Sequence, residues 1–219
     1  AIPLNVPIGT PAYAALRDQL RKDIISGQIP NGTRLTIARI VERYGVSQMP
    51  VREALQALQG EGLVTISPHK GARVLSLDAR FVRNVYDIRA AVESLLALSA
   101  LAHLDGKGLE GLEAAQRRLD AVAGAGSAEE FFELNKQFHF NLYSHSDNEE
   151  AFHIYDHYNS LLSALRRVYD FTPRRRVQVL QEHWAIVEAL RSGDAERIVR
   201  SMILHINHGG DEMLANMAQ

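Results

Sequence analysis

The 219-residue sequence predicts a mainly α-helical protein, in which an N-terminal winged helix-turn-helix precedes an all-α antiparallel helix bundle. Two observations carry this prediction. The first part of the chain has the order helix, helix, tight turn, helix and hairpin. The rest shows helical periodicity interrupted by short breaks, without strand alternation. We therefore expect two domains, at residues 1–77 and 78–219.

The composition is that of a globular protein able to bury a core, with 46% hydrophobic and 23% charged residues. The absence of Cys excludes disulfides and thiolate metal sites. No apolar run reaches the roughly 18 residues that a membrane-spanning helix needs. The first residues lack the basic and then apolar pattern of a signal peptide. We expect a cytoplasmic protein without a membrane partner.

Local signals place the elements of the first domain. Apolar residues at helical spacing predict a first helix, which Gly and Pro end at "SGQIPNG". Thr36 is a candidate cap for a second helix, Gly45 with Val46 forms the turn, and Ser47 caps a third helix. Pro50 lies in the first turn of that helix, where its missing N–H costs nothing. "LVTIS" and "ARVLSL" are typical of two short strands around the hairpin tip "PHKG".

Charge is divided unequally between the two domains. Residues 1–77 hold nine Lys or Arg and five Asp or Glu, a net charge of +4, whereas the remaining residues carry −6. A basic first domain indicates that this part of the chain is the one that meets a polyanion.

The exposed face of the third helix suits DNA recognition. Gln48 and Arg52 are i, i+4 neighbours near its N-terminal end, where a recognition helix meets base edges. Arg can clamp O6 and N7 of guanine, and Gln suits N6 and N7 of adenine. The alternative for Arg52 is a pair with a nearby acid, such as Glu53 or Glu61, on a solvated face.

Further residues extend this surface. Arg34 and Arg39, just before and within the second helix, can reach phosphate or an adjoining base. Met49 either contacts a thymine methyl group or packs as an ordinary surface hydrophobe. His69 and Lys70 at the hairpin tip lie where a wing would touch the neighbouring groove.

These segments resemble a known family. "SGQIPNGTRL", "ERYGVSQMPVREALQALQGEGLV" and the following hairpin are similar to the DNA-binding domain of GntR-type bacterial repressors, over roughly residues 11–76. The resemblance implies a homodimer on double-stranded palindromic operator DNA. In that family an arginine, which reads a guanine, and then a threonine follow the serine, whereas Gln48 and Met49 stand at those places here. We expect A·T to replace the usual G·C where Gln48 reaches.

The residues and the resemblance together define the predicted DNA-binding set. Arg34 and Arg52 match family positions that contact DNA, and the hairpin tip matches the family's wing loosely. The set is Arg34, Arg39, Ser47, Gln48, Met49, Arg52, His69, Lys70 and Gly71.

Short breaks divide the second domain into about six helices. They lie at "LDGKG", "GAGS", "SHSDN", "DFTP" and "SGD". In the last of them, Gly193 fits a C′ glycine and Asp194 fits the N-cap of the following helix.

Three histidines and one asparagine of this domain are candidate metal ligands. Asn135 and His139 are i, i+4 neighbours beside the apolar stripe of one helix, and His183 and His205 lie on the apolar faces of two later helices. One oxygen and three imidazoles from three helices of one bundle can converge on a divalent metal. The alternative is three separate core histidines, each satisfied by a neighbouring carbonyl or carboxylate. Spacing does not decide between them.

The second domain resembles the FCD ligand domain of the FadR-like GntR subfamily over roughly residues 78–215. "VYDIRAAVES", "NKQFHFNLYSHSDN", "EHWAIVEALRSGDAERI" and "MILHI" carry the resemblance. That domain commonly binds a metal through an Asp and three His, and these places hold Asn135, His139, His183 and His205 here. Because an amide coordinates without neutralising charge, we expect weaker metal binding or a stronger need for an anionic ligand. Zn²⁺ or Ni²⁺ is the expected divalent occupant.

Arg89 is the predicted effector-binding residue. The family's arginine at this place implies a clamp for the carboxylate of a small organic acid that faces the metal. The alternative is an intrahelical pair with Glu93. We interpret Arg166–Arg167 and Arg174–Arg176 as solvated charge, and we assign no role to His145, His153, His157 and His208.

The predicted function is a metabolite-responsive DNA-binding transcriptional regulator, a repressor and not an enzyme. One alternative is a helical metal-dependent hydrolase with an accessory DNA-binding head, in which Glu182 is the general base. Neighbouring helix residues point about 100° apart, so Glu182 is not expected to share the pocket of His183. Another alternative is a dimerisation domain without metal, which Asn135 leaves open.

Overall fold

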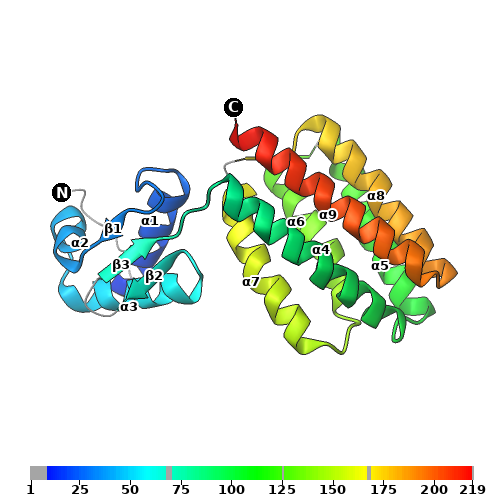
Figure 1. The fold of residues 1–219 in the computed structure, drawn as a ribbon, viewed down its shortest axis with the longest axis horizontal. Coiled ribbons are helices and arrows are strands. Elements are labelled where there is room, and N and C mark those ends of the chain that lie inside the picture. The colour runs from blue at the N-terminus through cyan, green and yellow to red at the C-terminus, as the bar shows by residue number, and fades with distance from the viewer. Residues whose placement is uncertain (1–8, 68–70, 125, 167–168, 219) are drawn as a thin grey trace. The chain divides into compact units, whose positions relative to one another are not determined.

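A computed structural model describes residues 9–67, 71–124, 126–166 and 169–218 of the chain. The chain divides into two compact units (Figure 1). The first runs to Asp78 and includes the segment from Ser160 to Val168, and the second holds the other residues from Ala79 on. The fold is mainly helical, as predicted.

The first unit is built from three helices and a small antiparallel sheet, the winged helix-turn-helix that the sequence predicts. The helices α1, α2 and α3 pack their apolar sides together over a core that includes Leu16, Leu20, Val51 and Leu58, each fully buried. The elements are α1 (Ala12–Ile25), β1 (Arg34–Leu35), α2 (Ile37–Tyr44), α3 (Gln48–Gly60), β2 (Val64–Ser67) and β3 (Gly71–Val74).

The sheet contains a third strand that the sequence did not predict. The order is β1-β3-β2, and β1 pairs with β3 through Arg34 opposite Arg73 and Leu35 opposite Ala72. Two residues are too short to show the alternation by which a strand is recognised. Only the contact with β3, which lies far along the chain, defines this strand.

The caps of the helix-turn-helix follow the prediction with one exception. The Thr36 side chain accepts a hydrogen bond from the Arg39 backbone N–H, and Gly45 ends α2 in the left-handed conformation at a φ of 68°. Ser47 occupies the N-cap position of α3 in an extended conformation, but its side chain makes no capping hydrogen bond. The Ser47 hydroxyl is therefore not committed to the helix end.

A buried carboxylate fixes α1 against α2. Asp23, only 3% exposed, accepts hydrogen bonds from the Tyr44 hydroxyl at 2.6 Å, Arg43 Nη2 at 3.0 Å and Gln19 Nε2 at 2.7 Å. The three donors compensate the Asp23 carboxylate for its loss of water. Removal of one of them would leave a buried charge without a partner and lower the free energy of unfolding. The network holds the second helix in place beneath the recognition helix.

The second unit is an all-helical bundle, as predicted. Each helix ends or begins at one of the five predicted breaks, and Gly193 and Asp194 act as the predicted C-cap and N-cap between the last two helices. None of the described helices is long and apolar enough to cross a membrane. Its helices are α4 (Ala79–Leu101), α5 (Gly106–Val122), α6 (Ala128–Tyr143), α7 (Glu149–Arg166, of which the residues up to Asn159 belong to this unit), α8 (Pro173–Ser192) and α9 (Ala195–Met217).

The helices α4 and α9 cross closely beside the core of the bundle. A Cβ atom at Gly210 of α9 would lie 2.9 Å from Cγ of Tyr86 on α4, so only glycine permits this approach. The main core cluster joins the helices around fully buried side chains such as Leu96, Phe138 and Ile186. This packing brings α6, α8 and α9 together where the candidate metal ligands lie.

Candidate metal centre and DNA-recognition surface

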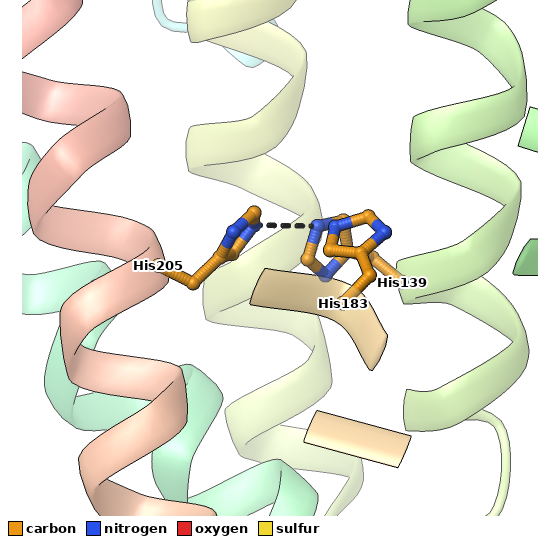
Figure 2. Close-up of side chains that lie close together, drawn as sticks. All are labelled: His139, His183 and His205. Carbon is orange, nitrogen blue, oxygen red and sulfur yellow. Dashed lines mark hydrogen bonds between the residues drawn. The ribbon is translucent and has the colours of Figure 1, made fainter. Parts of the chain in front are cut away.

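Three histidines meet in the interior of the second unit, as one of the two sequence interpretations requires. His139 on α6, His183 on α8 and His205 on α9 point toward one another (Figure 2), and their ligand atoms all lie within 4.8 Å of each other. These three residues are at most 6% exposed. The closest approach is 3.1 Å, between Nε2 of His205 and Nε2 of His139.

The Nδ1 atom of His183 is held from the outer side of this group. It lies 2.8 Å from Oε1 of Gln116 on α5. The Gln116 amide N–H donates to Asp120, so its oxygen faces the ring and accepts a hydrogen bond from Nδ1–H. The lone pair of His183 Nε2 consequently faces the other histidines.

The Nδ1 atom of His139 belongs to a longer chain of polar groups. Nδ1 lies 3.2 Å from the Tyr143 hydroxyl, which itself donates to Glu93 at 2.6 Å. The hydroxyl oxygen therefore accepts from Nδ1–H. Glu93, fully buried, also pairs with Arg89 at 2.5 Å. Tyr143 was not among the predicted site residues, although its i, i+4 spacing from His139 indicates that the two side chains can meet.

The third Nδ1 atom is held by a carboxylate that the sequence interpretation placed elsewhere. Nδ1 of His205 lies 2.8 Å from Oε2 of Glu182, and Nδ1 of His208 lies 2.6 Å from Oε1. Glu182 does avoid the pocket of His183, because the two residues point apart on α8. The neighbouring helix α9, however, brings His205 to it, so Glu182 and His208 both belong to the centre.

Burial keeps the imidazoles neutral. It lowers the pKa of His139 to about 4 and the pKa of His183 and of His205 well below the ordinary value. The positive charge of Arg175 acts in the same direction on all three rings. Neutral imidazole is the form that binds a metal, so no proton has to be displaced at neutral pH.

The donor atoms present fit a divalent cation. Oδ1 of Asn135, one turn before His139 on α6, and Nε2 of His183 are buried without a hydrogen-bond partner among the described residues. The Nε2 atoms of His139 and His205 lie 3.1 Å apart (Figure 2), and with the proton of each ring on Nδ1 both would offer a lone pair to a cation. Hydrogen-bond partners on the outer ring nitrogens, which fix the orientation of the imidazoles, are a usual feature of histidine metal sites.

Arg89, the predicted effector-binding residue, lies next to this group. Its side chain is 11% exposed and pairs with Glu93 one turn later, which is the alternative that the sequence left open. Burial opposes its charge, but the Glu93 carboxylate, together with Tyr86 and Tyr155, raises the pKa of Arg89 above its ordinary value. Through Glu93 and Tyr143, the guanidinium is connected to His139 by hydrogen bonds.

Two runs of arginine that were interpreted as solvated charge include buried members. Arg175 is 3% exposed and pairs with both oxygens of Glu182 at 2.8 Å. Arg176 donates to the Gly126 carbonyl, and Arg166 is 7% exposed. The interpretation as solvated charge was wrong for Arg166 and Arg175, because a run of charges does not show which helices pack over it, whereas Arg174 is exposed as interpreted.

The N-terminal end of α3 is exposed in the first unit. Gln48 and Arg52 are exposed, and Met49 is 65% exposed. Arg52 forms no ion pair within the described part of the chain, whereas Glu61, its suggested alternative partner, pairs with Arg21. The recognition helix thus has an amide, a thioether and a free guanidinium on its open face.

The other members of the predicted DNA-binding set surround this face in part. Arg34 and Arg39 are exposed on β1 and α2, and Ser47 is exposed before α3. Gly71 opens β3 with a φ of 79°, a conformation that favours glycine. His69 and Lys70 lie outside the described residues.

Comparison with known families assigns both parts of the chain. Residues 12–74 match the family described as bacterial regulatory proteins, gntR family. Residues 84–208 match the FCD domain.

Individual proteins agree with these matches. The chain is 29% identical over 201 residues to the HTH-type transcriptional regulator YdhC of Bacillus subtilis (strain 168). The aligned residues cover 91% of this chain and 89% of that protein. It is 28% identical over 187 residues to the HTH-type transcriptional repressor RspR of Escherichia coli (strain K12), with 85% and 82% covered. A crystal structure of a GntR family member from Pseudomonas syringae pv. tomato str. DC3000 has a TM-score of 0.53 at 25% identity, covering 93% of this chain and 85% of that one.

Proposed function

The chain belongs to the GntR family of bacterial transcriptional regulators with an FCD domain, and on this premise we propose that it represses transcription as a homodimer on palindromic operator DNA, which it releases when a small organic acid binds the FCD domain. The chain is a DNA-binding regulator and not an enzyme, so the hydrolase alternative is not supported. The name of RspR supports repression as the mode of action.

The first unit supplies the DNA-binding surface. Gln48, Met49 and Arg52 are exposed at the end of α3 that would enter the major groove. Arg34 and Arg39 would bind phosphate and so hold the helix in register. A net charge of +4 on residues 1–77 favours association with DNA and makes it dependent on salt.

The convergence of three histidines is the observation that carries the proposal for the second unit. Asn135, His139, His183 and His205 would hold a divalent ion, with Zn²⁺ or Ni²⁺ expected on grounds of affinity. When bound, such an ion is a Lewis acid that accepts a carboxylate oxygen. The Arg89 guanidinium would then bind the same carboxylate of the organic acid while it keeps its ion pair with Glu93.

Linkage between the two sites tests the proposal. The operator and the organic acid oppose each other, so saturating operator must weaken acid binding by the factor by which the acid weakens operator binding. We would titrate organic acids into the metal-loaded protein by calorimetry, with and without a palindromic operator selected from random DNA. Unchanged acid affinity in the presence of operator would contradict the coupling.

A bundle without metal, serving dimerisation alone, is the second candidate function of the FCD domain. It is favoured by the neutral amide at Asn135. Metal analysis of the purified protein beside His139→Ala and His183→Ala variants separates the two. Stoichiometric metal in the parent protein, lost in both variants, supports the metal-containing centre, and its absence from all three supports the other.

A further inference from the structure

Glu182 differs from every other group that holds a histidine of the centre. Each Nδ1 atom has one partner: the Gln116 amide oxygen, the Tyr143 hydroxyl, and the Glu182 carboxylate. Only the last is an anion in direct contact with a ring. His205 is therefore the one histidine of the centre whose Nδ1 atom directly contacts a carboxylate.

The surroundings of Glu182 keep its carboxylate in place. Arg175 contacts both carboxylate oxygens at 2.8 Å, and its Nη2 donates to the His205 carbonyl at 3.1 Å. His208 contacts the other side of the carboxylate at 2.6 Å. Glu182 is 8% exposed and Arg175 is 3% exposed, so water screens these charges little. The group is built to hold one orientation.

The donors that would surround a cation carry no charge. They are three neutral imidazoles and the Asn135 amide. Glu93 is the other buried carboxylate linked to the centre, but Tyr143 lies between it and His139, and Arg89 pairs with it. Glu182 thus contacts the ring of a metal-binding histidine directly, whereas two hydrogen bonds separate Glu93 from the nearest such ring.

We propose that Glu182 is a positioning residue of the metal centre, which supplies through His205 the negative charge that the four neutral donors lack. The inference rests on the proposed metal centre. In it, Glu182 fixes the His205 ring with Nε2 toward the ion and stabilises the positive charge that coordination places on that ring. Arg175 opposes the ion by its own charge, whereas His205 and His208 hold the carboxylate by contacts that do not depend on Arg175.

The test is the affinity of the full-length, metal-depleted protein for Co²⁺, whose visible absorption reports its ligands. Glu182→Gln keeps the shape and an oxygen acceptor but removes the charge. We expect Co²⁺ binding to weaken by about 10- to 100-fold, the range typical when the hydrogen-bond partner of a metal-binding histidine is changed. Glu188→Gln is the matched control, because it is the same substitution in α8 at a carboxylate that pairs only with Arg191 among the described residues. Its Co²⁺ affinity should equal that of the parent protein.

Arg175→Gln separates charge from packing. It removes the opposing cation and is expected to bind Co²⁺ several-fold more tightly than the parent protein. Damage to packing alone would weaken binding in both variants. Circular dichroism at the titration temperature establishes that each protein is folded, and Arg175→Gln alone decides if Glu182→Gln does not fold.

Three outcomes overturn the proposal. The first is parent-like affinity and an unchanged Co²⁺ spectrum in folded Glu182→Gln, and the second is weaker binding in Arg175→Gln. The third is the absence of Co²⁺ binding by the parent protein, which overturns the metal centre itself. Because only the third affects the parent protein, failure of the two proposals is distinguishable.

Discussion

At residue 135 the chain has an amide where a cation would benefit from a carboxylate. The Asn135 oxygen is buried without a hydrogen-bond partner in the described structure. An unsatisfied buried polar atom costs about 1–3 kcal/mol, so it is retained only where something else is gained. Coordination of an ion is a gain of this kind.

Asn135→Asp is expected to bind Zn²⁺ or Co²⁺ about tenfold more tightly or better, because it adds a negative charge to a set of neutral ligands. The same change should destabilise the metal-free protein, since the new charge is then buried alone. Competition with a chromophoric chelator measures the first effect and urea unfolding the second. Asn141→Asp is the control, because Asn141 lies on the same helix and its Oδ1 is also buried without a partner. Equal tightening in both variants would contradict a ligand role for Asn135.

The exposed amide of Gln48 leads to a second prediction at the scale of single residues. Gln48→Ala should cost about 1–3 kcal/mol on an operator with adenine at the base pair that Gln48 reaches, and should relax selectivity there. Arg34→Ala should instead weaken binding to all sequences alike and lower the salt slope by about 1. Selection from random DNA with each variant distinguishes these patterns. A fixed guanine at that position, unaffected by Gln48→Ala, would show that the amide does not read the base.

At the scale of elements, local chemistry made the helix ends predictable. Thr36, Gly45, Gly193 and Asp194 act on their own backbone neighbours, so their roles follow from adjacent sequence. The strand β1 and the contacts of Glu182 depend instead on segments far along the chain. His139 and His205 meet across 66 residues, and only their apolar helix faces indicated that each ring lies inside. That the three rings meet at one place could be seen only in the packing of α6, α8 and α9.

The close crossing of α4 and α9 yields a prediction for Gly210. Alanine is favoured over glycine within a helix by about 1 kcal/mol, yet a Cβ here would lie 2.9 Å from Tyr86 Cγ. We expect Gly210→Ala to lower the free energy of unfolding by about 1–3 kcal/mol, the usual cost of overpacking. Gly111→Ala is the comparison, because its Cβ would meet only the Asn141 side chain at 3.9 Å. Urea unfolding should show this variant unchanged or stabilised; similar losses in both would argue against the crossing as the cause.

At the scale of the whole molecule, buried neutral histidines connect stability with pH. Burial lowers the pKa of His139 to about 4 in the folded chain, whereas the pKa of an unfolded His is about 6.5. The unfolded chain therefore takes up protons that the folded chain does not. The contribution to stability is complete above about pH 6.5 and declines as the pH falls toward 4.

The expected result is a lower urea midpoint for the metal-depleted protein at pH 5 than at pH 7.5. His139→Gln should show a smaller difference between the two pH values, because one of the buried imidazoles is absent. An identical pH dependence in the variant would mean that other groups govern acid sensitivity.

The enclosure of the three rings has a kinetic consequence. Because His139, His183 and His205 are at most 6% exposed, an ion enters or leaves only when α6, α8 or α9 opens locally, and exchange is slowed by the free energy of that opening. An ion bound during folding then outlasts short changes in metal supply. The regulator would keep its ion as a lasting component, and an organic acid that binds this ion would need the same opening to reach it.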